Sequence, residues 1–164
     1  MMEFTTTKLN ETTVLFEKEF KASAERVFKM FSVGEHLKKW WAPNGFEMGI
    51  SQMDFRENGT WFYSMECVDK SMGEFYGTKS FGKAIYSKIV ESKNINYVHY
   101  FSDEAGTTEG MPHQTLEAIF TEAGGITKVS YKTIFTSEQE CSQIAPFMEP
   151  GLKQAFEHLT DLLK

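Results

Sequence analysis

The sequence predicts one α+β domain, in which a curved antiparallel sheet of six or seven strands holds a long C-terminal helix across its concave face. From Pro150 to Leu163, apolar residues recur at i, i+3, i+4 and i+7, so they share one face of a helix. Most of the preceding chain alternates between apolar and polar residues over short stretches separated by turn residues, which is typical of antiparallel strands. Two short helical segments follow the first strand, so helices and strands are segregated along the chain.

The N-terminal segment, residues 1–11, is polar, and we expect it to be frayed or to form a short edge segment. The remaining residues, 12–164, are enough for a single domain with a buried core. The first strand is predicted over Thr13–Phe20, where Val14 and Phe16 face one side and charged residues face the other.

Two short helices are predicted after this strand. Ser23 is a favourable N-cap for the first helix, over residues 24–31. The second, over residues 35–40, leads into two adjacent tryptophans, Trp40 and Trp41. One indole ring is expected to fill the core, while the other caps it or borders the mouth of a pocket.

The central part of the chain supplies the other strands. Gly77 and Gly82 interrupt one of them and predict a bulge or a bend there. Asp54 and Arg56 flank a hairpin turn and are expected to form an ion pair, although Arg56 could instead recognise an acidic ligand group. The predicted strands cover residues 46–54, 60–67, 74–89, 95–101, 113–121 and 127–135.

The C-terminal helical region begins with a capping box formed by Ser137 and Glu140. Pro146 and Pro150 are expected to divide this region, because proline lacks the N–H that a helix interior needs. We therefore expect a short lead-in over residues 138–145, followed by the long helix.

Composition excludes several classes of protein. The net charge is −6 and the basic residues are scattered, so we expect no nucleic-acid partner. No apolar run approaches the roughly 18–20 residues that span a membrane, and no secretory signal is present, so we expect a cytoplasmic protein. Cys67 and Cys141 are far apart and are expected to be reduced thiols. No motif for a metal or a cofactor is present, so we expect neither.

Several segments together resemble a known superfamily. Their order and spacing are similar to the helix-grip superfamily of START and polyketide-cyclase-like domains (SRPBCC), and most of all to its branch of activators of heat-shock-protein-90 ATPase homologues. The resemblance implies a helix-grip fold with a pocket between the sheet and the last helix. The segments are residues 20–28, the double-tryptophan stretch 37–46, the turn 54–59, Met65, residues 86–97, Phe101-x-Asp103-x-x-Gly106, and Met148-x-x-Gly151 with the helix behind it.

The chain departs from the pattern of that family at four places. Asn58 replaces a turn glycine, Ala84 replaces a strand glycine, and Val33-Gly34 replace a usual Asp-Pro. Leu152 replaces a common tryptophan on the last helix, which would widen or reshape any cavity at that point. A ligand of a relative is therefore not carried over to this chain.

Aromatic residues and methionine are abundant, with fifteen Phe, six Tyr, three Trp and nine Met. These side chains either pack directly between sheet and helix, or some of them line a cavity of about 300–1,000 Å³. The candidate ligand-binding residues are Trp41, Trp61, Tyr63, Met65, Tyr97, His99, Tyr131, Leu152 and Phe156.

Three functions remain open from the sequence. The leading hypothesis is a binding protein for a hydrophobic or aromatic small molecule. The alternative is a protein-interaction domain of the chaperone-cofactor kind, for which Phe62 and the Trp40–Trp41 region are the places to look for an exposed patch. The third is a cyclase- or dehydratase-type enzyme, for which His99 is the best acid–base candidate and no catalytic set is assigned.

Overall fold

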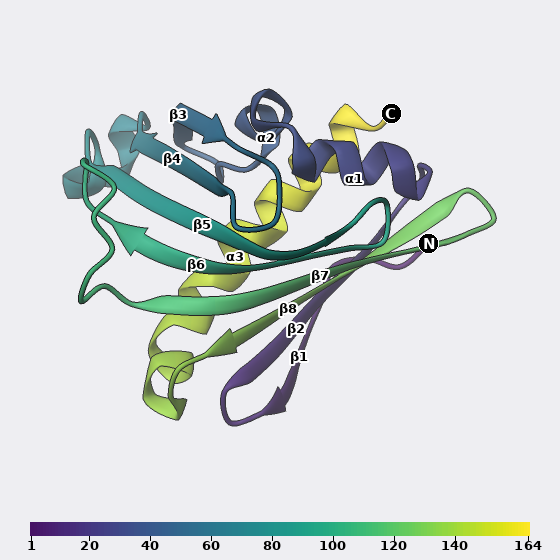
Figure 1. Ribbon diagram of the computed structural model, residues 1–164. Coiled ribbons are helices and arrows are strands. Elements are labelled where there is room, and N and C mark those ends of the chain that lie inside the picture. The colour runs from purple at the N-terminus through teal and green to yellow at the C-terminus, as the bar shows by residue number, and fades with distance from the viewer.

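The structure is a computed structural model that describes residues 1–164. Eight antiparallel strands form one sheet in the order β1-β2-β8-β7-β6-β5-β4-β3 (Figure 1). The strands are β1 Thr5–Asn10, β2 Thr13–Phe20, β3 Phe46–Met53, β4 Thr60–Cys67, β5 Lys79–Val90, β6 Asn94–Ser102, β7 His113–Ala123 and β8 Ile126–Phe135.

The sheet has eight strands and not the expected six or seven, and β1 is the additional strand. Thr5–Asn10 were expected to be frayed or a short edge segment, and they form an edge strand that pairs with β2. All six side chains of β1 are exposed, so no alternation of apolar and polar residues marks this strand in the sequence. Backbone pairing holds it, together with Phe4, whose ring lies 5.8 Å from that of Phe16 on β2.

The connection from β2 to β3 carries the two predicted short helices, α1 (Ala24–Ser32) and α2 (Gly34–Trp40). Ser23 caps α1 as expected, because its side chain accepts a hydrogen bond from the backbone N–H of Arg26 at 3.2 Å. Arg26 also donates to the backbone carbonyl of Leu163 at 2.8 Å, which ties α1 to the end of the last helix.

The last helix, α3, is continuous over Glu138–Leu162, so the expected division at the prolines is wrong. Pro146 and Pro150 both lie on the exposed side of α3. The carbonyls that lose their usual N–H partner therefore face solvent, where water can take the place of the missing donors.

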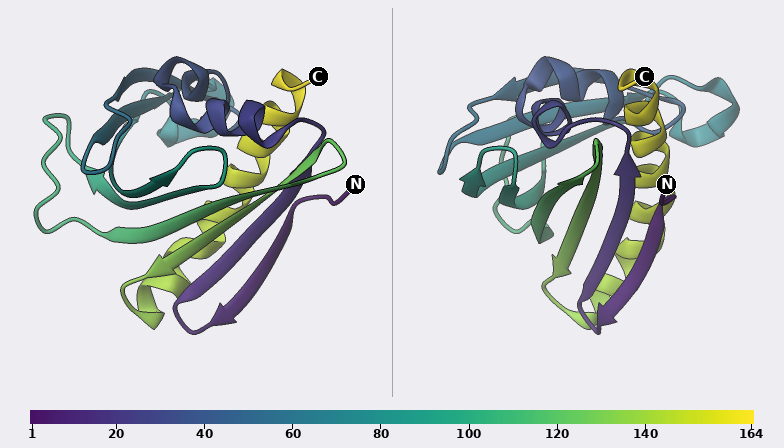
Figure 2. Two further views of the ribbon diagram at one scale, coloured as in Figure 1. Left: turned by 45° about the vertical axis from the view of Figure 1, so that its right-hand side comes forward. Right: turned by 90° about the vertical axis from the view of Figure 1, so that its right-hand side faces the viewer.

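α3 runs along the inside of the curled sheet, and α1 and α2 close the end at which it finishes (Figure 2). Phe156 is fully buried at the centre of this arrangement. Its ring packs within 6.4 Å of the rings of Phe4, Phe20, Phe31, Trp40 and Tyr131. None of the helices combines the length and the apolar character that crossing a bilayer requires.

A 3₁₀ helix at Lys70–Phe75 precedes β5, so β5 begins later than the predicted residue 74. The expected bulge is absent at Gly82, because the register of β4 and β5 is continuous there and the shift in β5 falls between Tyr86 and Lys88. Gly77 lies in the turn before β5, where its φ is 83°. Gly82 instead allows a close side-chain contact. A Cβ atom at that position would lie 2.5 Å from the phenol of Tyr63, so the glycine makes room for that ring.

Candidate functional site

A cavity of about 290 Å³ lies between α3, over residues 144–155, and the concave face of the sheet. Fifteen residues line it, of which eleven are hydrophobic, and none is Asp, Glu, Lys or Arg. A second space, which Trp41 also lines, measures only about 10 Å³. The cavity is much larger than this space, and it opens to solvent on the side of its exposed lining residue Phe147.

Six of the nine candidate residues from the sequence border this cavity. They come from the α2–β3 connection, three strands and the last helix: Trp41, Tyr63 and Met65 of β4, His99 of β6, Tyr131 of β8 and Leu152 of α3. Trp41 is half-buried, and its ring contacts those of Trp61 and Tyr131 edge-on. Trp40 is buried and its indole N–H donates to the carbonyl of Met30 at 2.9 Å.

The other three candidates lie behind the wall of the cavity. Trp61 stacks on the ring of Tyr63 at 4.4 Å between centroids, and its N–H donates to Ser51 Oγ at 3.0 Å. Tyr97 and Tyr131 share a hydrogen bond between their hydroxyls. Phe156 belongs to the packed core. These three residues support the site without bordering it.

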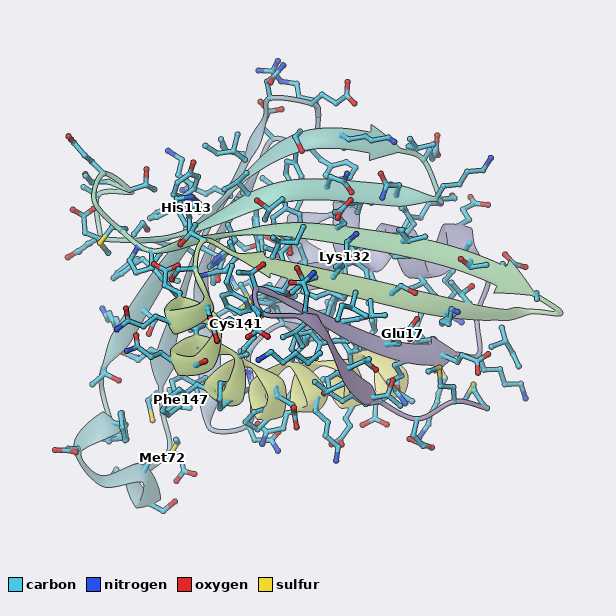
Figure 3. The ribbon with its side chains drawn as sticks, turned by 90° about the horizontal axis from the view of Figure 1, so that it is seen from below. Glu17, Met72, His113, Lys132, Cys141 and Phe147 are labelled. Carbon is cyan, nitrogen blue, oxygen red and sulfur yellow. The ribbon has the colours of Figure 1, made fainter.

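Nine lining residues were not among the candidates. Those on α3 follow the spacing i, i+3, i+4, i+7 when the helix is taken as continuous from residue 138, so the same periodicity would have found them. Phe147 is the most exposed of them at 83%, and it projects from the outer part of α3 at the end of the molecule that also carries Met72 (Figure 3). The nine are Pro43, Phe101, Gln114, Leu116, Ile144, Phe147, Met148, Gly151 and Ala155.

Polar side chains form a short chain of hydrogen bonds along one wall of the cavity. Tyr63 Oη lies 2.7 Å from His99 Nε2, and His99 Nδ1 lies 3.3 Å from Gln114 Oε1. An amide oxygen only accepts hydrogen bonds, so the imidazole proton is on Nδ1 and the Tyr63 hydroxyl donates to Nε2. Both ring nitrogens of His99 are therefore occupied.

These groups are uncharged near neutral pH. Burial lowers the pKa of His99 to about 4, because the cavity wall disfavours the imidazolium. Burial raises the pKa of Tyr63 to about 12, and it raises the pKa of Tyr131 as well. With no charged side chain in its lining, the cavity presents an apolar interior with a few neutral polar atoms.

The position of Tyr63 depends on the strand beside it. Tyr63 on β4 pairs directly with Gly82 on β5, and Gly82 pairs with Phe101 on β6. Because Gly82 has no side chain, the phenol lies across β5 and reaches His99 on the next strand. Gly82 thus allows a side-chain hydrogen bond between β4 and β6, two strands that are not adjacent.

Other features considered from the sequence lie outside the cavity. Asp54 and Arg56 form the expected ion pair, with Oδ2 and Nε 2.8 Å apart, in an exposed turn that does not border the cavity. The expected exposed patch is absent where it was sought, because Trp40 is buried and Phe62 is half-buried against Phe81. No cluster of three or more His, Cys, Asp or Glu side chains is arranged to hold a metal ion.

A curled antiparallel sheet closed by a long C-terminal helix defines a helix-grip domain. Within that class, the family model described as activator of Hsp90 ATPase homolog 1-like protein matches residues 21–164, and the chain belongs to this family. The resemblance drawn from the sequence is thereby confirmed.

Solved structures share the fold. The chain is 23% identical to protein Ms6760 from Mycobacterium smegmatis, with a TM-score of 0.84 and coverage of 98% of this chain and 97% of that one. A protein from Arthrobacter aurescens is 21% identical, with a TM-score of 0.85 and coverage of 97% of this chain and 90% of that one. A protein from Staphylococcus epidermidis is 24% identical, with a TM-score of 0.80 and coverage of 97% of this chain and 93% of that one. These likenesses show the fold alone. No curated protein matches the chain.

Proposed function

We propose that the protein binds a hydrophobic or aromatic small molecule in the cavity between α3 and the sheet. The observation that carries this proposal is the cavity of about 290 Å³ between α3 and the sheet, with a mostly hydrophobic lining. Specific small-molecule sites are concave and mostly apolar, with a few placed polar groups. The lining, with eleven hydrophobic residues and the Tyr63–His99–Gln114 chain, has this composition.

Titration of the protein with a panel of bicyclic aromatic compounds, followed by two-dimensional NMR, tests the proposal. Resonances of residues on the cavity wall, such as Met65 and Leu152, are expected to shift and saturate. Leu152→Trp should fill the space and weaken binding at least about tenfold, since binding energy depends on the room for the apolar group. Lys153→Trp adds the same ring on the exposed side of α3 and should leave binding unchanged.

Failure of every compound to shift the cavity resonances at saturating concentration would contradict the proposal. Native mass spectrometry of the purified protein is an independent measurement, because a ligand retained from the host cell appears as added mass that Leu152→Trp abolishes.

A protein-interaction role is the second candidate, at a place that the sequence did not indicate. Phe75 and Tyr76, in the connection between β4 and β5, are 58% and 47% exposed, and Phe147 is 83% exposed. Exposed aromatic side chains of this kind are enriched at interfaces. A Phe75→Ser and Tyr76→Ser double variant that lost a co-purifying protein partner, with ligand binding intact, would favour this role.

Enzymatic activity has the weakest support. A general base must have a free lone pair within hydrogen-bond reach of the substrate proton. Both nitrogens of His99 are already bonded to Tyr63 and Gln114, so the best acid–base candidate from the sequence has no free position.

A further inference from the structure

One polar group in the cavity wall lacks a partner. Gln114 on β7 is 3% exposed and lines the cavity. Its amide oxygen faces His99 Nδ1, while its amide nitrogen, Nε2, has no hydrogen-bond partner in the protein. Buried side-chain donors are nearly always paired, so an unpaired one calls for an explanation such as a bound group.

The backbone around Gln114 fixes where this amide lies. In the sheet, Gln114 is paired with His99 on one side and with Phe135 on the other. The bond to His99 then fixes the side-chain oxygen. The amide nitrogen is therefore left buried and without a partner on a residue that lines the cavity, and preorganised binding sites hold their few polar groups in this way.

We propose that the ligand is an uncharged molecule carrying one hydrogen-bond acceptor of the carbonyl type, which accepts from Gln114 Nε2 while its apolar part contacts Trp41 and Leu152. This inference rests on the proposed function and specifies the class of ligand. A ketone, an ester or an amide carbonyl has the required acceptor.

The other polar atoms of the wall favour a ligand whose hydrogen-bond acceptor is uncharged. Tyr63 donates to His99, while Tyr131 and Tyr97 share one hydrogen bond that uses only one of their two hydroxyl hydrogens, so the polar groups of the wall are all uncharged. A carboxylate would enter a lining without Lys or Arg, and burying an unpaired anion in such a place is strongly unfavourable. An alcohol could accept from Gln114, but its own hydrogen would then need an acceptor.

Three ligands of one shape test the inference. 2-Acetylnaphthalene has the carbonyl, 2-isopropenylnaphthalene replaces its oxygen by a methylene group, and 2-naphthoate carries the anion. Dissociation constants are measured by NMR titration of the wild-type protein. We expect the ketone to bind about 5–30 times more tightly than the hydrocarbon, which is the usual worth of one hydrogen bond to an otherwise unpaired group. The naphthoate should bind more weakly than the ketone.

Gln114→Met keeps the length of the side chain and removes the amide, so the ketone-to-hydrocarbon ratio should fall to within about twofold of unity. Thr115→Val, next to it on the opposite face of β7, should leave the ratio as in the wild type. The side-chain N–H₂ resonances of Gln114 give a reading in the wild-type protein alone. They should shift with the ketone and not with the hydrocarbon.

Equal binding of ketone and hydrocarbon to the wild type would overturn this inference and leave the proposed function standing, because a trapped water would then satisfy Nε2. Tighter binding of naphthoate than of the ketone would overturn the assignment of an uncharged ligand. If none of the three binds, both this inference and the proposed function fail.

Discussion

Replacing Phe156 by alanine should cost the protein much of its stability. The side chain is fully buried, and five aromatic rings surround it. Truncating a buried phenylalanine typically costs about 3–5 kcal/mol, from lost transfer free energy and from the space left behind. The upper part of that range applies here, because several edge-to-face ring contacts are lost at once and each is worth about 0.5–1.5 kcal/mol.

Urea unfolding followed by tryptophan fluorescence measures this loss, since Trp40 and Trp41 both lie near the substituted position. For a chain of this length, a loss of 3–5 kcal/mol corresponds to a fall in Tm of roughly 6–20 °C. Phe147→Ala is the matched control on the same helix. Its ring is 83% exposed, so its effect should stay within about 0.5 kcal/mol. A loss below about 1 kcal/mol for Phe156→Ala would refute the packing of α3 against the sheet.

Three further predictions concern the cavity wall, the strand that supports it and an exposed turn away from the cavity. His99 has a folded pKa of about 4 and an unfolded value near 6.5, so its stabilising effect is present above pH 6.5 and is lost as the pH falls. Between about pH 7.5 and 4.5, wild type should lose on the order of 2 kcal/mol more than His99→Gln in urea unfolding, and equal losses would contradict the neutral imidazole. Gly82→Ala should push the Tyr63 phenol away and cost about 1–3 kcal/mol, with a changed His99 ring resonance; an unchanged resonance would contradict the contact. Arg56→Ala should cost no more than about 1 kcal/mol by thermal unfolding, because its ion pair with Asp54 is exposed, and a larger loss would contradict a surface role.

The sequence was sufficient for the parts of the fold that depend on the burial of apolar side chains. The alternation in β4 and β8 and the apolar face of α3 from Leu152 to Leu163 place their residues against the core as expected, except for Leu162, which is 39% exposed. The segment of β1 was left open between a frayed end and a short edge segment, because its side chains are all exposed and only pairing of the backbone with β2 marks it as a strand.

The candidate site was predictable only in part, because tertiary contacts decide which aromatic residues fill the core and which border a void. Phe156 and Trp41 look equally suitable in the sequence, yet one is at the centre of the core and the other borders the cavity. Gln114 has no sequence signal at all, since a single polar residue in a strand is ordinary. Gln114 is important because His99 on the neighbouring strand bonds only the oxygen of its amide and leaves the amide nitrogen without a partner.

Different side chains of the continuous helix α3 meet the core and the cavity, which has a consequence for how such proteins diverge. Phe156 and Leu159 are fully buried in the core, whereas Ile144 and Met148 are only partly buried and border the cavity. Mutations at Ile144 or Met148 can therefore alter what the cavity admits while Phe156 and Leu159 preserve the fold. Selectivity and stability are in this way assigned to different turns of one helix, and natural selection can act on each of them separately.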